Sequence, residues 1–151
     1  MPTVRGCHLP DDLYYDVDNH IWFRERADGT VQLGMTTVAT AMAGQLVAFT
    51  PKKVGRDVQA GKSCATVESG KWVGPAKSAA AGEIVAVNDD LVAKPSLANE
   101  DPYEAGWLVV LRPADWASVK ASLVPGSQVA APYEAKMAAD GFAGCACAPG
   151  S

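Results

Sequence analysis

The sequence predicts a mainly β fold, a compact β-sandwich or flattened barrel with peripheral helices. Short apolar runs with alternating polar residues recur along much of the chain, and glycine-containing turns separate them. Helical spacing of apolar residues dominates only toward the end. The 151 residues suit one domain, and the 48% of hydrophobic residues suffice for one core.

The first predicted elements are a hairpin, a short helix and a strand. Residues 20–36, HIWFRERADGTVQLGMT, alternate apolar and polar side chains on both sides of a turn at Asp28-Gly29. The stretch TTVATAMAG predicts a helix that stops at Gly44. The apolar stretch QLVAFT predicts a strand that ends at Pro51.

Two glycine-punctuated segments follow and echo each other weakly. VGRDVQAGKSCATVES precedes Lys71 and AAAGEIVAVNDDLVAKPSL follows it, and each contains short strands. The second segment is expected to turn at Asn88-Asp89. GWLVVLRP predicts a further strand, PADWASVKASL predicts a helix opened by Pro113, and YEAKMAADGF predicts a last helix that stops at Gly141.

Composition argues against several classes of function. A net charge of -4 and a pI of about 5.1 make a nucleic-acid surface unexpected. No apolar run approaches the roughly 20 residues that span a bilayer. The first residues lack the apolar stretch of a signal peptide, so a cytoplasmic location is predicted. No nucleophile–base set and no phosphate loop is recognisable, so the chain is not predicted to be an enzyme.

The four cysteines are expected to be thiols unless they serve redox chemistry or bind metal. Cys64 lies in a predicted strand and is interpreted as a small buried hydrophobe. Cys7, Cys145 and Cys147 lie near the ends, where exposure is expected. Cys145 and Cys147 are candidate redox thiols, or else idle thiols of a tail. A metal site from these three with His8 matches no standard zinc spacing, so no metal is predicted.

Gly70 and Lys71 separate SCATVES from WVGPAKS. Glycine at the first position of a two-residue loop suits a type II′ hairpin turn. Lys71 would then lie at a hairpin tip with its amine far from the core. A solvated turn is the ordinary explanation of such a lysine, whereas the echoing segments on its two sides favour a functional position.

Three longer stretches resemble the H protein of the glycine cleavage system, in order: HIWFRERADGTVQLGMTTVATAMAGQLV, VGRDVQAGKSCATVESGK and AAAGEIVAVNDDLVAKPSLANEDPYEAGWL. The resemblance covers about Leu13 to Leu123. The patterns ESxK, GEIVAVN and NxDPYxxGWL are specific in combination and weak one by one. In that family the lysine after Glu-Ser-x carries lipoic acid in amide linkage, which implies a covalent lipoyl group on Lys71. A biotinyl lysine usually lies between two methionines, and Gly70 and Trp72 differ from that pattern.

The resemblance implies a lipoyl/biotinyl-type flattened β-barrel, a barrel-sandwich hybrid, with the lipoyl lysine on a hairpin tip and C-terminal helices. The expected organisation is an N-terminal segment 1–19, a lipoyl domain 20–112, a helical extension 113–142 packed on the same domain, and a flexible Cys-containing tail 143–151. Such a chain is a non-enzymatic carrier. Glu68 and Ser69 would offer a recognition surface to a lipoate ligase or lipoyl transferase.

The text ESGKWVGP departs from a typical H protein, which has small residues after the lysine. Trp72 is interpreted either as sheet packing or as a contact to the arm or a partner. With the cysteine near the end, this text resembles the lipoate-binding proteins of the sulfur-oxidising heterodisulfide-reductase-like pathway. The implied partners are that complex and dihydrolipoyl dehydrogenase. The alternative is an H protein that carries an aminomethyl group between the glycine cleavage P and T proteins.

Overall fold

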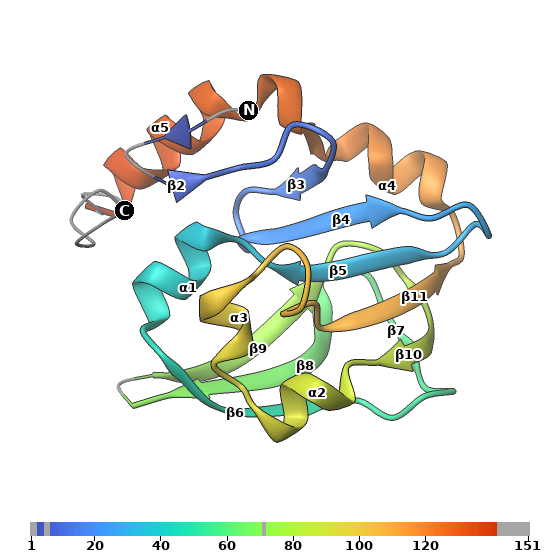
Figure 1. Cartoon of the computed structure of the whole chain (residues 1–151). Coiled ribbons are helices and arrows are strands. Elements are labelled where there is room, and N and C mark those ends of the chain that lie inside the picture. The colour runs from blue at the N-terminus through green and yellow to red at the C-terminus, as the bar shows by residue number, and fades with distance from the viewer. Residues whose placement is uncertain (1–2, 5–6, 71, 142–151) are drawn as a thin grey trace.

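The computed structural model describes residues 3–4, 7–70 and 72–141 (Figure 1). Their strands pair antiparallel in three sheets. The largest sheet has the order β12 (Val124–Pro125), β3 (Tyr14–Asp16), β4 (Ile21–Glu25), β5 (Val31–Met35), β11 (Val109–Pro113), β10 (Gly82–Val87) and β7 (Asp57–Val58). The second has the order β6 (Leu46–Pro51), β8 (Lys62–Ser69) and β9 (Val73–Ser78), and the smallest pairs β1 (Thr3–Val4) with β2 (Cys7–His8). The predicted mainly β fold is confirmed.

The helices are short and peripheral. Figure 1 shows α4 and α5 along the outer side of the largest sheet, while α1 lies beside α3 and β5, and α2 lies beside β6. The helices are α1 (Thr37–Ala43), α2 (Asp89–Ala93), α3 (Leu97–Glu100), α4 (Trp116–Ser122) and α5 (Ala130–Ala139), with one 3₁₀ turn, η1 (Gly126–Gln128).

Strand β4 is buried on both faces and thereby separates two hydrophobic clusters. Ile21 and Phe23 point into the cluster between the two larger sheets, which also contains Val67 of β8. Trp22 points the other way, into a second cluster that includes Tyr133 of α5. Residues i and i+2 of a strand lie on one face, so the run Ile-Trp-Phe serves both clusters. The alternation predicted for this hairpin is confirmed, and the second cluster explains why Trp22 is also apolar.

The local signals around α1 behave as predicted. Gly29 lies in the turn of the first hairpin with φ 85°. Thr36 caps α1, because its hydroxyl accepts a hydrogen bond of 3.2 Å from the amide of Ala39. Gly44 follows the helix with φ 85°, a conformation that favours glycine. Thr36 therefore fixes the start of α1, and Gly44 fixes its end.

Several elements differ from the prediction. Asn88 does not turn the chain but caps α2, its side-chain oxygen accepting from the amide of Leu91 at 3.4 Å. Pro113 is the last residue of β11 rather than the start of a helix, and Asp115 caps α4 instead. Helix α3 was not predicted, since four residues carry no readable periodicity.

Strand β9 is an edge strand in the described part of the chain, because its only partner there is β8. Pro75 stands in this strand opposite Thr66. Proline has no amide hydrogen to donate and is tolerated at such an edge.

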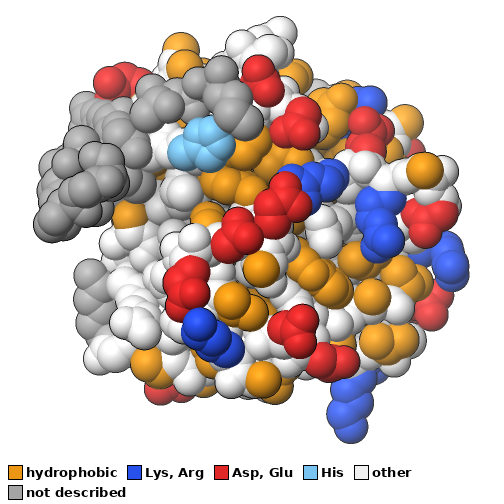
Figure 2. Space-filling view, in the orientation of Figure 1, with side chains coloured by type: hydrophobic (Ala, Val, Ile, Leu, Met, Phe, Trp, Pro, Cys, Tyr) orange, Lys and Arg blue, Asp and Glu red, His pale blue; other side chains and the backbone are white. Residues whose placement is uncertain are grey.

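Both signs of charge are interspersed with apolar side chains on the face shown in Figure 2. No helix among the described residues is long and apolar enough to cross a membrane.

Candidate functional site

The ESxK segment ends β8, and β9 returns beside it. Glu68 lies opposite Val73, and the amide of Ser69 donates a 2.7 Å hydrogen bond to the carbonyl of Trp72. The predicted hairpin is therefore confirmed up to Gly70 and Trp72. Lys71 lies outside the described residues, so its role as the lipoyl site stays a prediction.

The predicted turn geometry is wrong. A type II′ turn needs a positive φ at its first central residue, and Gly70 lies outside the left-handed range. Glycine at this position therefore does not serve a left-handed backbone. No heavy atom would lie within 4 Å of a Cβ placed there, so Gly70 is an open position on the surface.

The side chains around the lysine point in different directions. Glu68 is exposed, whereas Ser69 is buried and its hydroxyl lies 3.4 Å from the carbonyl oxygen of Trp72. Trp72 is 42% exposed. Its indole ring folds back along β9 and covers Gly74, where any Cβ would overlap the ring. Residues two apart in a strand share a face, so Trp72 lies on the face that also carries buried Ala76.

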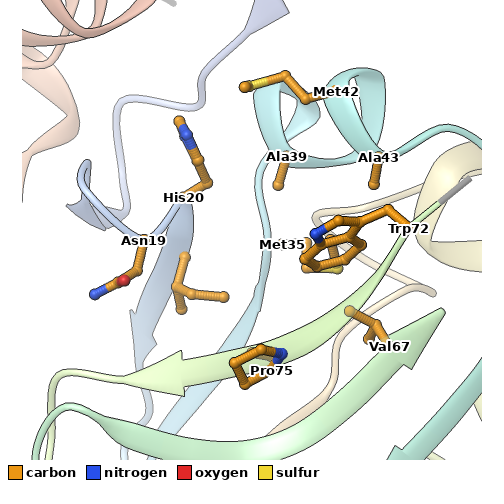
Figure 3. A pocket seen from close by; sticks show the side chains of 11 residues that line it. Asn19, His20, Met35, Ala39, Met42, Ala43, Val67, Trp72 and Pro75 are labelled. Atoms are coloured by element: carbon orange, nitrogen blue, oxygen red, sulfur yellow. The ribbon is translucent and has the colours of Figure 1, made fainter. Parts of the chain in front are cut away.

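An apolar cavity of about 470 Å³ opens on this face of the hairpin (Figure 3). This volume lies in the range of small-molecule sites. Figure 3 shows the indole of Trp72 beside Met35, with Ala39 and Ala43 of α1 pointing toward the same space. The cavity is lined by Asn19, His20, Ile21, Met35, Ala39, Met42, Ala43, Val67, Trp72, Pro75 and Ala76.

Asn19 and His20 form the polar end of the cavity. His20 has a positive φ of 57°, its ring stacks on Tyr133 at 5.6 Å, and its Nδ1 lies 3.1 Å from the Tyr133 hydroxyl. Burial lowers the pKa of His20, and the positive charge of Lys136 lowers it further. The imidazole is therefore held neutral near pH 7. The backbone amide and side-chain amide of Asn19 donate to Asp16 at 3.3 and 2.8 Å.

Exposed apolar side chains surround the end of the hairpin. Six large hydrophobic residues are exposed among the described residues, and four of them lie at or beside this end: Met42, Val47, Trp72 and Val73. Val47 and Gly70 line a second, shallow hollow on the side of β6. Apolar surface gathered in one place marks an interaction site more often than scattered residues do.

The sequence pointed to Trp72 but not to His20 or to the rest of the cavity wall. That wall is built by α1 and the end of β5, which lie far from the hairpin in sequence. One feature of the sequence could have indicated that α1 forms a cavity wall. Ala39, Met42 and Ala43 are spaced on one face of this helix, which has no charged residues.

The cysteines differ from expectation in one case. Cys64 is a buried thiol, as predicted, and burial raises its pKa to about 12. Cys7 was expected to be an exposed thiol, but it is fully buried and disulfide-bonded. Its partner lies outside the described residues, as do Cys145 and Cys147. Within the described ranges, no three His, Cys, Asp or Glu side chains gather as metal ligands.

Comparison with known proteins identifies the family. The family model of the glycine cleavage H-protein matches residues 13–136. The chain belongs to the glycine cleavage H-protein family. It is 51% identical over 134 residues to glycine cleavage system H protein 5 of Aquifex aeolicus, covering 86% of this chain and 90% of the relative. It is 44% identical to H protein 2 of the same organism, covering 85% of this chain and 80% of the relative.

A solved structure supports the same conclusion for the fold. The crystal structure of a glycine cleavage system H protein from Mycobacterium marinum superposes with a TM-score of 0.72 at 35% identity. It covers 85% of this chain and 98% of the solved chain. The chain therefore has the H-protein lipoyl-domain fold, a flattened barrel-sandwich, as the resemblance implied.

Proposed function

We propose that this protein is a lipoyl carrier with lipoic acid in amide linkage on Lys71. The observation that carries the proposal is the β8–β9 hairpin, in which the ESxK segment runs to the end of one strand beside an apolar cavity. A carrier must present one group to several enzymes, which needs a long arm on a rigid platform. The antiparallel hairpin supplies the platform, and the proposed role is not that of an enzyme.

The residues around residue 71 fit a lipoyl arm. Trp72, the next residue along the chain, lines the cavity, whose remaining wall is largely apolar. The apolar arm of a lipoyl-lysine would lie between the indole and α1 when no partner is bound. When attached, the dithiolane would supply a disulfide that thiolates open by exchange. Glu68 stays exposed, where a lipoate ligase or lipoyl transferase would reach it.

We further propose that the carrier serves cytoplasmic sulfur oxidation with a heterodisulfide-reductase-like complex. Dihydrolipoyl dehydrogenase would reoxidise the arm. Trp72 in the cavity supports this, since the H-protein pattern has small residues after the lysine. The alternative remains the H protein of glycine cleavage, which carries an aminomethyl group between the P and T proteins.

One experiment tests both levels of the proposal. The chain is lipoylated by a lipoate ligase, and intact mass is measured for wild type, Lys71→Ala and the matched control Lys77→Ala. Lys77 pairs with Ser63, well down the hairpin from residue 71. One adduct is expected on wild type and Lys77→Ala, and none on Lys71→Ala. An adduct that survives Lys71→Ala contradicts the assignment.

The same lipoylated sample is then compared with a standard H protein in glycine decarboxylase exchange at equal lipoylation. A much lower rate is expected for this carrier, because Trp72 alters the space beside the arm. Equal rates would return the function to glycine cleavage while leaving the carrier assignment intact.

A further inference from the structure

We propose that the cavity beside Trp72 selects the charge of the cargo on the arm: it accepts an uncharged group and rejects a cationic one. The inference rests on the proposed lipoyl attachment at Lys71. It narrows the cargo from any group that a dithiol can carry to those without a positive charge. An aminomethyl group, which is an amine, would then be a poor occupant.

The described wall of the cavity offers no carboxylate that could pair with an ammonium group. Among the described residues, eleven line the cavity, and none of these is Asp, Glu, Lys or Arg. Helix α1, which forms the wall opposite the hairpin, has no acidic residue in its first turn and no basic residue in its last. Moving an ammonium group from water to such a wall is unfavourable unless a carboxylate pairs with it.

The acids nearest the polar end do not supply that pairing. Asp16 is already engaged by two donors of Asn19 at 2.8 and 3.3 Å, and it does not line the cavity. Asp18 is exposed to solvent. Asp140 lies 3.5 Å from Lys136, which is itself a cation close enough to lower the pKa of His20. The negative charges of Asp140, Asp16 and Asp18 raise the pKa of His20, against burial and Lys136, but none of these carboxylates borders the space that a guest would occupy.

The polar side chains that do line the cavity suit a neutral guest. His20 Nδ1 lies 3.1 Å from the Tyr133 hydroxyl, and the lowered pKa of His20 keeps the imidazole neutral, so it brings no charge to the cavity. Trp72 offers the face of an indole ring to any guest. A cation–π contact with that face is weaker than the desolvation that an ammonium would undergo.

Gly74 makes room for the indole of Trp72. Because a Cβ at residue 74 would overlap the indole, glycine there allows Trp72 to lie flat along β9 and form a wall. Trp72, the residue at which the ESGKWVGP segment departs from the H-protein pattern, thus makes the cavity more apolar beside the proposed arm.

The test uses two arms that differ chiefly in charge. The lipoylated chain is reduced, and its dithiol is alkylated with iodoacetamide to give a neutral adduct or with 2-bromoethylamine to give a cationic one. Unlipoylated chain treated in parallel corrects for alkylation of the cysteines. The readout is the ¹H–¹⁵N resonances of Ala39, Ala43 and Ala76 and of the Trp72 indole, with intact mass as the loading check.

The neutral adduct is expected to shift these resonances, whereas the cationic adduct leaves them where the unlipoylated chain has them. The ratio of cavity-bound to free arm should differ by about tenfold or more. Equal shifts from both adducts overturn the proposed selection. Absence of shifts from both, with full loading by mass, overturns it as well but leaves the carrier assignment standing. Failure of the ligase to load Lys71 contradicts the carrier assignment itself.

A charge-reversal variant gives the opposite result if the argument is right. Met42→Glu adds a carboxylate at the cavity wall, so the cationic adduct should gain occupancy and the neutral one should lose it. The matched control is Val92→Glu, an exposed valine of α2 that does not line the cavity, which should change neither. The proposed charge selection is refuted if Met42→Glu and Val92→Glu have the same effect on the cavity occupancy of the two adducts.

Discussion

His20 shows how one residue ties the cavity to the outer layer of the molecule. Its left-handed backbone conformation, φ 57°, is uncommon for residues other than glycine, although asparagine, aspartate and histidine adopt it more often than the rest. The ring is held by stacking on Tyr133 and by the hydrogen-bond contact to its hydroxyl. Tyr133 belongs to α5, so the polar end of the cavity depends on the C-terminal helix.

We predict that His20 makes stability depend on pH. Its pKa lies below its usual 6.5 in the folded chain, so the unfolded chain binds more protons as pH falls through 6.5. The stability that the neutral ring contributes is present above that value and is lost below it. Thermal melts at about pH 7.5 and about pH 5 should differ more for wild type than for His20→Asn. Asparagine tolerates the left-handed backbone. Parallel pH profiles for the two proteins would contradict this role.

Residue-level prediction from sequence succeeded where the signal was local. The departure at Trp72 was recognised, but its two interpretations could not be separated. The structure shows the indole packing on Gly74, two residues on along the same strand face, a contact that becomes meaningful only once β9 is known. Contact of Trp72 with the arm or a partner stays a proposal. The type II′ prediction for Gly70 failed because glycine preference states what a backbone tolerates and not what it adopts.

At the scale of elements, Asn88 holds the start of α2 to the loop that precedes β11. The side-chain amide donates to the carbonyls of Ala105 and Trp107, both at 2.8 Å, and its oxygen faces the amide of Leu91. The residue is almost fully buried. One side chain thus satisfies two loop carbonyls and one helix donor.

We predict that Asn88→Ala destabilises the fold by about 2–4 kcal/mol, because it leaves buried backbone groups without partners. The melting temperature should fall by roughly 5–15 °C. Asp89→Ala, in the exposed first turn of the same helix, is the control and should cost under about 1 kcal/mol. Chemical denaturation with an unchanged m-value checks that the loss is one of stability. Similar losses in the two variants would contradict the assigned role of Asn88.

Elements made by neighbours in sequence were predictable, and those made by distant segments were not. The β4–β5 hairpin and α1 carry their turn and cap residues with them. The pairing of β7 with β10 and of β11 with β5 joins segments that share no local signal. The resemblance to H proteins supplied the barrel-sandwich as a whole, which periodicity could not, but neither predicted these strand pairs.

At the scale of the whole molecule, the second hydrophobic cluster joins the two ends of the described chain. Val4 and Cys7 from the N-terminal strands meet Tyr133 and Met137 of α5 in it. Cys7 is fully buried there and disulfide-bonded. Disulfides are uncommon in reducing compartments, so the redox state of Cys7 in cells tests the cytoplasmic location proposed above.

We predict that reduction destabilises the protein by about 2–4 kcal/mol, the usual contribution of a disulfide. Thermal melts with and without reductant should differ for wild type and for Cys64→Ala, which removes the buried thiol and spares the bond. Cys7→Ala should melt alike in both conditions. Coincident melts of wild type with and without reductant would contradict a stabilising bond. Non-reducing peptide mapping identifies the cysteine to which Cys7 is joined.

Pro75 in the edge strand β9 limits how other proteins can bind to this side of the molecule. A strand from another molecule laid along β9 would meet a position that donates no hydrogen bond, so polymerisation by sheet extension is discouraged. Partner proteins would then bind through side chains around the end of the β8–β9 hairpin. Contacts between side chains dissociate more readily than a shared β-sheet. Fast dissociation suits the proposed carrier, which would bind one enzyme after another.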